Sequence, residues 1–450
     1  MTMTGSDQSA PTYFDDMKLT SSHKRMLWLA AICYMFDQMD VGTFAYAAPV
    51  LVKTWGLTME QIAQVNSYGF VGMFLGAIFG GWIADKIGRK KTIILCVAIF
   101  SLGSLGNALA FNFHTLAITR FFTGLGVIGM LVVAMVYIAE MMPSEHRGRY
   151  QALTMACGTI AIPVGAAFAR WVVPLSTESW RYIFVLGGTS ILLLPFCFIV
   201  FKESPRWLVS KGRITEAEKV IREITGREVD LSSEVPEKIK KSSSLSTLKL
   251  ILSKEYLKRT IILVIITDGV VLGAQMLGGF YPAILQEYAG FQLTLVLSIM
   301  ALSWWGIPFG DLSASLVSDK GGRKGPLALF SIINGMTFVV CGFFPTPAVI
   351  IAAVFLSRVF GGGSVSILYT YLAESYPTHI RSTAVGLIMG QVRILSAVIV
   401  LIVPPILATY GWLGVHLVNA GIIIVTAIVA LIFGQKTSKR TLEEINKAPG

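Results

Sequence analysis

Twelve apolar stretches, each long enough to cross a lipid bilayer, constrain this chain of 450 residues more than any other feature. A helix needs about 20 apolar residues to span the hydrocarbon core of a membrane. The stretches lie near 26–51, 63–84, 92–112, 114–139, 150–173, 181–201, 259–287, 293–317, 325–344, 347–373, 383–409 and 411–434. Only 14% of the residues are charged and 54% are hydrophobic, which is too apolar for a soluble protein. We therefore expect an all-α membrane protein with twelve transmembrane helices.

The distribution of lysine and arginine predicts how these helices are oriented. Most of the 37 basic residues lie in the N-terminal tail, the C-terminal tail, the central polar segment and the other loops on the same side. Such loops remain in the cytoplasm. The predicted units are therefore a cytoplasmic tail at 1–25, a six-helix bundle at 26–201, a cytoplasmic linker with short helices at 202–258, a second six-helix bundle at 259–434 and a cytoplasmic tail at 435–450.

Several function classes are disfavoured by the residues that the chain lacks or disperses. The five cysteines all lie inside apolar stretches without a CxxC pair, so we expect neither disulfides nor a metal site. The five histidines lie at span ends or in loops, and no catalytic constellation occurs, so we expect no cofactor and no enzyme. The net charge of +11 is confined to short loops, which does not indicate a nucleic-acid partner.

The two predicted bundles carry the same charged loop motifs at a constant offset of 234 residues. One motif contains Asp85, Gly88, Arg89 and Lys90 in the first half and Asp319, Gly322, Arg323 and Lys324 in the second. The other contains Glu140, Pro143 and Arg147, repeated as Glu374, Pro377 and Arg381. Two matches at one offset indicate a duplicated unit.

The charged residues of these motifs are candidates for ion pairs at the inner face. An aspartate at a helix end can pair with an arginine of a neighbouring loop, such as Asp85 with Arg147, and hold the halves together when the outer side is open. The alternative is that the motifs only set the membrane topology. The candidates are Asp85, Arg89, Glu140, Arg147, Asp319, Arg323, Glu374 and Arg381.

These motifs resemble those of the major facilitator superfamily over essentially the whole chain. The loop motif is similar to the G-x-x-x-D-x-x-G-R-K signature, and Arg120 to Gly126 resembles the R-x-x-x-G-x-G motif of the fourth helix. Glu203-Ser204-Pro205-Arg206-Trp207-Leu208 and Thr441 to Ile445 resemble runs of the sugar porters and their metabolite-carrying relatives. The resemblance implies two pseudo-symmetric six-helix bundles that work by alternating access.

The seventh stretch departs from the sugar-porter pattern. Sugar porters carry two glutamines and an asparagine there, whereas Gln275 to Pro282 contains one glutamine and no asparagine. The resemblance is therefore closer to proton-coupled carriers of organic acids, such as niacin-type and aromatic-acid carriers.

Ionisable residues inside the apolar stretches need a partner or a role, because each costs about 2.5–3.5 kcal/mol to insert. Asp40 and Arg120 each lie about 21 Å from the inner face at about 1.5 Å per residue, so they can pair. Paired with Arg120, the Asp40 carboxylate stays charged; separated from it in an apolar channel, it binds a proton. Asp40 also matches the position of the proton-coupling aspartate of sugar–proton symporters. The alternative is that Asp40 and Arg120 form a permanent structural pair. Asp37, one turn earlier, is a weaker candidate for proton coupling.

The same depth estimate predicts a second aspartate–arginine pair in the other half, between Asp268 and Arg358. Asp311 is a further buried acid, which we interpret as a second proton site or as a partner for Arg358.

Arg393 lies near the middle of the eleventh stretch, where no acid is adjacent in sequence. Its guanidinium can bind both oxygens of a carboxylate, and organic-anion carriers of the superfamily resemble this chain in having such an arginine. The alternative is a structural pair with Asp268 or Asp311. Residues that could add hydrogen bonds to a substrate are Gln391, Gln275, Tyr281, Tyr369 and Asn66.

The sequence thus favours a secondary transporter that takes up a small organic acid with protons. A sugar or polyol proton symporter is the first alternative, and a non-transporting sensor or scaffold on the same fold is a second. We expect a multi-pass, monomeric protein of the bacterial plasma membrane whose partners are the substrate, protons and the lipid bilayer.

Overall fold

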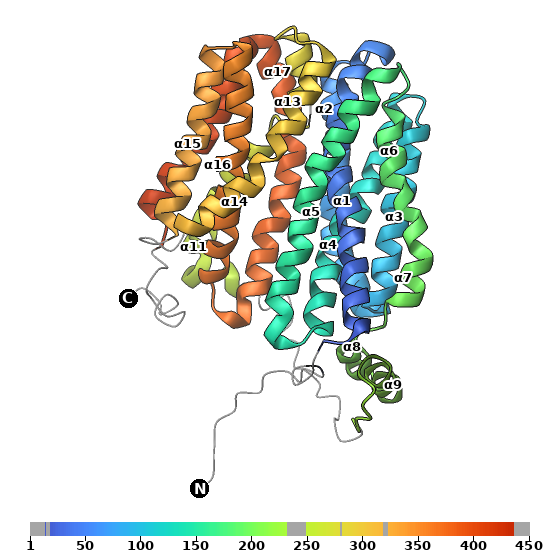
Figure 1. The fold of residues 1–450 in the computed structure, drawn as a ribbon. Helices are drawn as coiled ribbons and strands as arrows, with labels where there is room; N and C mark the ends of the chain where they lie inside the picture. Colours follow the sequence, from blue (N-terminus) through green and yellow to red (C-terminus); the bar gives the residue numbers. More distant parts are fainter. Residues whose placement is uncertain (1–13, 15–18, 232–248, 280, 318–322, 436–450) are drawn as a thin grey trace.

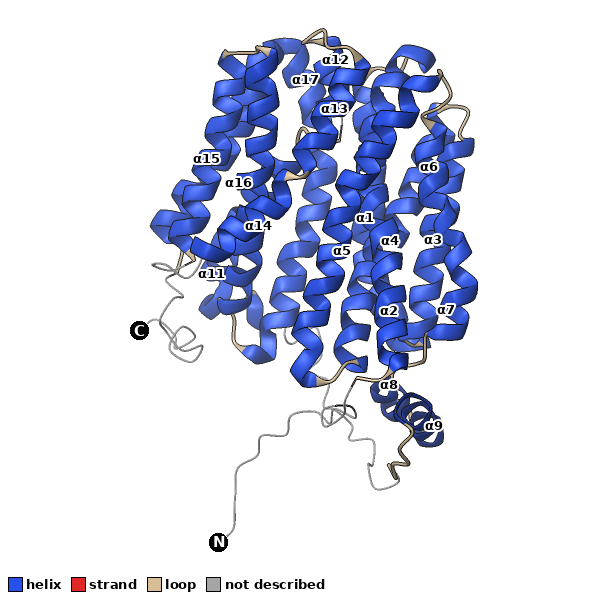
Figure 2. Ribbon diagram, in the orientation of Figure 1, coloured by secondary structure: helices blue, strands red, loops and turns tan. Residues whose placement is uncertain are grey.

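The structure is a computed structural model of residues 1–450, and it describes residues 14, 19–231, 249–279, 281–317 and 323–435 (Figure 1). This described part contains helices and loops and no strand (Figure 2). The helices are α1 Ser21–Trp55, α2 Met59–Ile87, α3 Arg89–Leu109, α4 Phe113–Met141, α5 Ser144–Val172, η1 Val173–Leu175, α6 Arg181–Gly188, η2 Thr189–Leu193, α7 Leu194–Val200, α8 Pro205–Ser210, α9 Ile214–Thr225, α11 Lys254–Gln275, α12 Tyr281–Glu287, α13 Leu293–Trp304, α14 Gly306–Val317, α15 Lys324–Phe343, α16 Pro347–Glu374 and α17 Thr378–Phe433.

Each predicted apolar stretch lies on one helix or on consecutive helices. Within the described ranges, nine helical segments are long and apolar enough to cross a membrane. One of these segments runs through α17, which covers two of the predicted stretches and breaks at Gly411, where φ is 64°. Only glycine adopts this left-handed backbone without strain. The helices α1 and α11 fall outside the nine, and both carry acidic residues within their apolar stretch.

Side-chain caps explain where several of the long helices begin. Thr20, Thr58 and Asn112 precede α1, α2 and α4, and the side chain of each accepts a hydrogen bond from the backbone N–H three residues later. These bonds satisfy N–H groups that have no partner within the helix. At the other end of α1, Gly56 takes the left-handed conformation that terminates a helix. The turn between α1 and α2 is therefore encoded locally.

The duplicated unit recurs in the way the helices pack. A Cβ atom at Gly76 of α2 would lie 2.3 Å from the backbone oxygen of Leu125 in α4. At the offset of 234 residues, a Cβ atom at Gly310 of α14 would lie 2.1 Å from the backbone oxygen of Val359 in α16. Small residues let transmembrane helices approach this closely. The two halves therefore share the same contacts between their second and fourth helices.

Three hydrophobic clusters fill the interior, and they are distributed unequally along the molecule. One cluster joins the two halves, since it combines residues of α1, α2 and α5 with residues of α12, α13 and α17. A second cluster contains residues only from the first half and reaches α8 and α9. The third contains residues only from the second half. Figure 2 shows α12 at one end of the bundle, the α12 end, and α8 and α9 at the other, the α8 end. The halves thus share a core at the α12 end and have separate cores elsewhere.

Candidate functional site

The ion pair expected between Asp40 and Arg120 is present and buried. Arg120 of α4 donates from Nη1 to Oδ2 of Asp40 in α1 over 3.3 Å, and both side chains are at most 5% exposed. Ser104 of α3 donates to Oδ1 of Asp40 over 2.8 Å, and Thr43 approaches the same oxygen at 3.5 Å. Hydrogen bonds to the remaining atoms of a buried pair offset its desolvation, and Ser104 supplies one on the carboxylate side. On the other side, Nε of Arg120 has no hydrogen-bond partner among the described residues.

Asp37 lies one turn earlier on α1 and has a different environment. Its side chain is fully buried, and neither carboxyl oxygen has a hydrogen-bond partner among the described residues. Because of this burial, Asp37, the weaker candidate for proton coupling, does not open onto accessible space. The neighbouring Tyr34 and Cys96 lie within electrostatic reach of it. Asp37 is therefore enclosed within the first half.

Arg393 of α17 is half-buried and has neither a hydrogen bond nor an ion pair with any described residue. It lies within electrostatic reach of the Tyr34 hydroxyl on α1 in the other half. Tyr369 of α16 also approaches Tyr34, yet 49% of its side chain is exposed. Tyr369 is therefore accessible where the two halves approach each other. Arg393, Tyr369 and the buried Tyr34 come to this position from three helices.

The acids considered as alternative partners of Arg393 are bound elsewhere. Gln391 donates to Asp268 of α11 over 2.5 Å, and Ser366 of α16 donates to Asp311 of α14. The expected pair between Asp268 and Arg358 was wrong, because Asp268 is bound to this neutral amide instead. Arg358 is also no repeat of Arg120, since the offset of 234 residues leads from Arg120 to Val354, one turn away. Among its described residues, the second half therefore shows no counterpart of the Asp40–Arg120 pair.

The remaining candidates for substrate binding are dispersed. Tyr281 is buried and its hydroxyl contacts Nε2 of His416 at 3.0 Å, so it is engaged within the second half. His416 lies five residues after the break at Gly411 and is fully buried. Asn66 Nδ2 and Gln275 Oε1 are buried without a hydrogen-bond partner in the described part of the chain.

Tyr34 and Gln38, which form a hydrogen bond on α1, were not among the site residues predicted from the sequence. Asp37 and Gln38 lie three and four positions after Tyr34 in a largely apolar stretch of α1. That spacing puts polar groups on adjoining positions of one helix surface and was the available signal.

The charge pairs expected at the inner face lie within each half, as far as the structure describes them. Arg89 binds Glu140 over 3.0 Å and Asp85 over 3.2 Å, and Arg323 binds Glu374 over 2.8 Å. Asp319 and the side chains of Arg147 and Arg381 lie outside the described residues. In this state the described pairs therefore stabilise each half and do not join the two.

Glu203, in the loop after α7, connects to the same network. Its carboxylate accepts hydrogen bonds from the backbone N–H groups of Arg89, at 2.7 Å, and Lys90, at 3.2 Å. Burial raises the pKa of the Glu203 carboxyl above its usual value, although these backbone donors act in the opposite direction. The glutamate of the E-S-P-R-W-L run thus attaches the start of the linker to the turn between α2 and α3.

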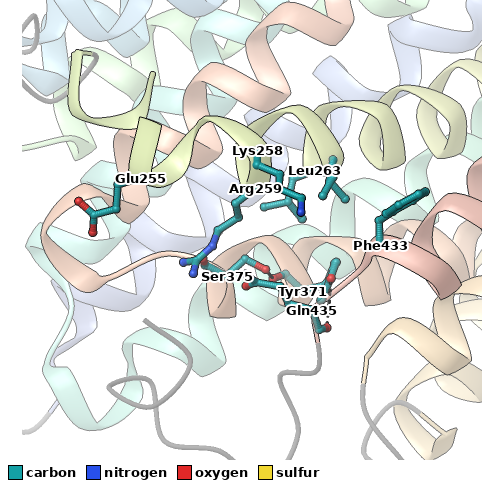
Figure 3. Close-up of a pocket in the computed structure, with 9 residues that line it drawn as sticks. Glu255, Lys258, Arg259, Leu263, Tyr371, Ser375, Phe433 and Gln435 are labelled. Atoms are coloured by element: carbon teal, nitrogen blue, oxygen red, sulfur yellow. Dashed lines mark hydrogen bonds between the residues drawn. The ribbon is translucent and has the colours of Figure 1, made fainter. Parts of the chain in front are cut away.

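A cavity of about 210 Å³ lies at the α8 end of the second half, between α11, α16 and the end of α17 (Figure 3). Lys258, Arg259 and Tyr371 line it, and Arg259 donates to the backbone oxygen of Ser375 over 2.9 Å. None of the residues predicted to bind substrate contributes to its wall. This cavity is therefore separate from the space beside Arg393.

Comparisons with known proteins agree with this arrangement. The family described as "Sugar (and other) transporter" matches residues 13–448. The chain is 30% identical over 442 residues to the putative metabolite transport protein YyaJ of Bacillus subtilis, covering 96% of this chain and 97% of that protein. It is 29% identical to the niacin transporter NiaP of Acinetobacter baylyi, over 96% and 98% of the two chains. It is 27% identical to the 4-hydroxybenzoate transporter PcaK of the same organism, over 81% and 82%.

The solved structure of a D-xylose–proton symporter has the same fold, with a TM-score of 0.76, 16% identity and coverage of 94% of this chain and 100% of that one. An inward-open structure of the xylose transporter XylE from Escherichia coli superposes with a TM-score of 0.74 and 17% identity, over 94% and 99%. The sequence relatives are bacterial membrane transporters, and none of those compared is an enzyme. The chain therefore belongs to the sugar transporter family of the major facilitator superfamily, as a multi-pass membrane transporter.

Proposed function

We propose that this transporter takes up a small organic acid together with protons, and that Arg393 binds the carboxylate of the substrate. The observation that carries the proposal is the state of Arg393, an intramembrane cation without an acidic partner in the described structure, next to Tyr34 and the exposed Tyr369. A guanidinium presents parallel N–H groups that fit a carboxylate. The substrate then supplies the negative charge that the protein does not.

Asp40 is the proposed proton carrier. In the present state it is paired with Arg120 and bonded to Ser104, which favours the ionised form. A rearrangement that separates Asp40 from Arg120 leaves an uncompensated carboxylate in an apolar environment, where it binds a proton. The three groups come from α1, α4 and α3, so a shift of α1 against its neighbours is enough to alter the pair. Proton binding is thereby linked to the conformational cycle.

The proposed architecture has twelve spans in two bundles, 26–201 and 259–434, with both termini and the linker 202–258 in the cytoplasm. The basic loops support this orientation. The joint cluster at the α12 end and the separate clusters elsewhere support an inward-open state, in which the space beside Arg393 opens toward the α8 end. We propose that the protein functions as a monomer.

A sugar or polyol symporter is the second candidate. The family match and the fold shared with a D-xylose–proton symporter favour it. The unpartnered amides of Gln275 and Asn66 also suit hydroxyl groups of a neutral solute. Neither amide accounts for the unpaired charge of Arg393, whereas a carboxylate does, so the organic acid is preferred.

The test is uptake by the purified protein in proteoliposomes under an imposed pH gradient. Radiolabelled nicotinate, 4-hydroxybenzoate and xylose are compared for the wild type, Arg393→Lys and Arg393→Gln. We expect the wild type to take up an acid. The uptake rate should fall at least tenfold in Arg393→Gln and less in Arg393→Lys, which keeps the positive charge without the paired N–H groups of the guanidinium. Lys53→Gln, at an exposed position of α1, removes one charge elsewhere and should not change uptake. Uptake of xylose alone would instead establish the sugar symporter.

A further inference from the structure

A second intramembrane arginine, Arg358 of α16, has no role in the function proposed above. It is half-buried and makes no hydrogen bond or ion pair with any residue that the structure describes. Its guanidinium lies 3.9 Å above the ring of Trp304 in α13. Such a cation–π contact offsets only part of the cost of placing a charge inside the membrane. The ring therefore leaves room for a further partner of this cation.

Two tyrosine hydroxyls complete the surroundings of Arg358. Tyr46 of α1 lies within electrostatic reach of the guanidinium, and so does Tyr281 of α12. The Tyr46 hydroxyl is buried, and the indole N–H of Trp304 is the one group in the described structure that approaches it as a donor. The proton of this hydroxyl has no acceptor there, so a ligand that accepts its hydrogen bond would remove the cost of burying it unsatisfied. A free guanidinium fork beside a free hydroxyl is a set of donors suited to a carboxylate.

This group is well separated from Arg393. Arg358 is close to Tyr46, and Arg393 is close to Tyr34. The two tyrosines are twelve residues apart on α1, which corresponds to about 18 Å along a helix. One small organic acid cannot bridge that distance. The substrate would therefore contact the two arginines one after the other, at two places along its route.

The position of Arg358 within the bundle indicates when the substrate would meet it on the way through the protein. Tyr46 and Tyr281 belong to the cluster that joins the halves at the α12 end, and Trp304 packs against it. When the halves separate at that end, Tyr46 moves away with the first half, while Trp304, Tyr281 and Arg358 remain with the second. The guanidinium then faces the opening.

We propose that Arg358 is an outer binding station for the carboxylate of the substrate, occupied before the acid reaches Arg393. Trp304 positions the guanidinium, and the Tyr46 hydroxyl donates to the second carboxylate oxygen as the α12 end closes. This inference rests on the proposed function, because it requires an anionic substrate that enters from the outer side.

The experiment measures uptake of nicotinate and of 4-hydroxybenzoate by proteoliposomes as a function of external concentration. Arg358→Gln should raise the half-saturating concentration at least tenfold, and Arg358→Lys should raise it less. Tyr46→Phe should raise it about threefold. Trp304→Leu should raise it as well, whereas Trp304→Phe, which keeps a ring below the guanidinium, should stay near the wild type. Trp305→Phe is the matched control, because the neighbouring Trp305 is 45% exposed and the cation–π contact of Arg358 is with the Trp304 ring.

An Arg358→Gln protein whose half-saturating concentration stays within twofold of the wild type would overturn the outer station. A loss of maximal rate at unchanged half-saturation would overturn it too, since that result indicates a structural role. If Arg358→Gln does not fold, Arg358→Lys and Tyr46→Phe decide the question by the same criterion. Failure of the proposed function is recognised separately, by wild-type protein that takes up neither acid. Uptake that depends on Arg393 but not on Arg358 would defeat only the outer station.

Discussion

At Asp40, four side chains meet in a space that excludes solvent, and the charge balance there depends on each of them. Ser104 and Arg120 donate to the two carboxylate oxygens, at 2.8 and 3.3 Å. Asp40→Asn keeps the size of the side chain and removes the proton-binding group. We expect gradient-driven accumulation of the substrate to fall at least tenfold in this variant. Exchange of internal for external substrate at equal pH should persist, since it moves no net protons. Uptake with and without a pH gradient, together with counterflow, measures both.

The matched control for that variant is Glu60→Gln, which neutralises an exposed acid at the start of α2. Its accumulation should equal that of the wild type. A response of Asp40→Asn to the gradient equal to that of the wild type would mean that Asp40 does not carry the proton.

Tyr281 provides a second prediction for a single residue, and it concerns stability. Its hydroxyl lies 3.0 Å from Nε2 of His416, and both residues are buried. Tyr281→Phe leaves that histidine nitrogen without its partner, which should lower the free energy of unfolding by about 1–3 kcal/mol. Thermal unfolding in detergent, with Tyr182→Phe at a position 58% exposed as control, measures the effect. Equal melting temperatures for both variants would contradict the prediction.

At the scale of the helices, the sequence predicted where each helix lies in the chain better than which of its faces packs against another helix. The apolar stretches and their caps depend on residues close together in the chain, and they led to the correct helical segments. The stretches are apolar on nearly all sides, so their sequence does not reveal which face meets another helix. Depth alone suggested a pair between Asp268 and Arg358. The rotation of α11 turns Asp268 toward Gln391 instead, and that contact spans 123 residues of the chain.

The glycine contacts between α2 and α4 allow a prediction about these elements. Gly76→Ala places a Cβ atom 2.3 Å from a backbone oxygen of Leu125, so the two helices must separate. Overpacking of this kind costs about 1–3 kcal/mol. Gly81→Ala, in the same helix, meets no atom within 4 Å and should stabilise the protein by up to about 1 kcal/mol. Thermal unfolding of the two variants in detergent compares them directly.

The repeat predicts that the second half responds in the same way. Gly310→Ala should destabilise the protein as Gly76→Ala does, because its Cβ atom would lie 2.1 Å from the backbone oxygen of Val359. Tolerance of alanine at Gly310 combined with destabilisation at Gly76 would mean that the two halves do not share this contact.

At the scale of the whole molecule, the duplicated loops predicted the repeat but not the interface between the halves. Arg393, Tyr369 and Tyr34 lie far apart in the sequence, and neither pattern nor spacing connects them. Arg170 of α5 likewise donates to Ser298 of α13 in the other half over 2.6 Å, and neither residue stands out in the chain. Such contacts depend on how two bundles dock, which is decided by many small apolar contacts at once.

This contact between α5 and α13 tests alternating access directly. With the five native cysteines replaced, Arg170→Cys and Ser298→Cys together can be joined by a short bifunctional thiol reagent that spans the length of the lost arginine side chain. In the proposed cycle the halves separate at the α12 end to admit substrate. The uptake rate of the linked protein should therefore fall at least tenfold, and reductive cleavage of the linker should restore it. Each single-cysteine variant treated with the same reagent should transport normally. A linked double variant that transports at the rate of the untreated protein would show that the α12 end does not open during the cycle.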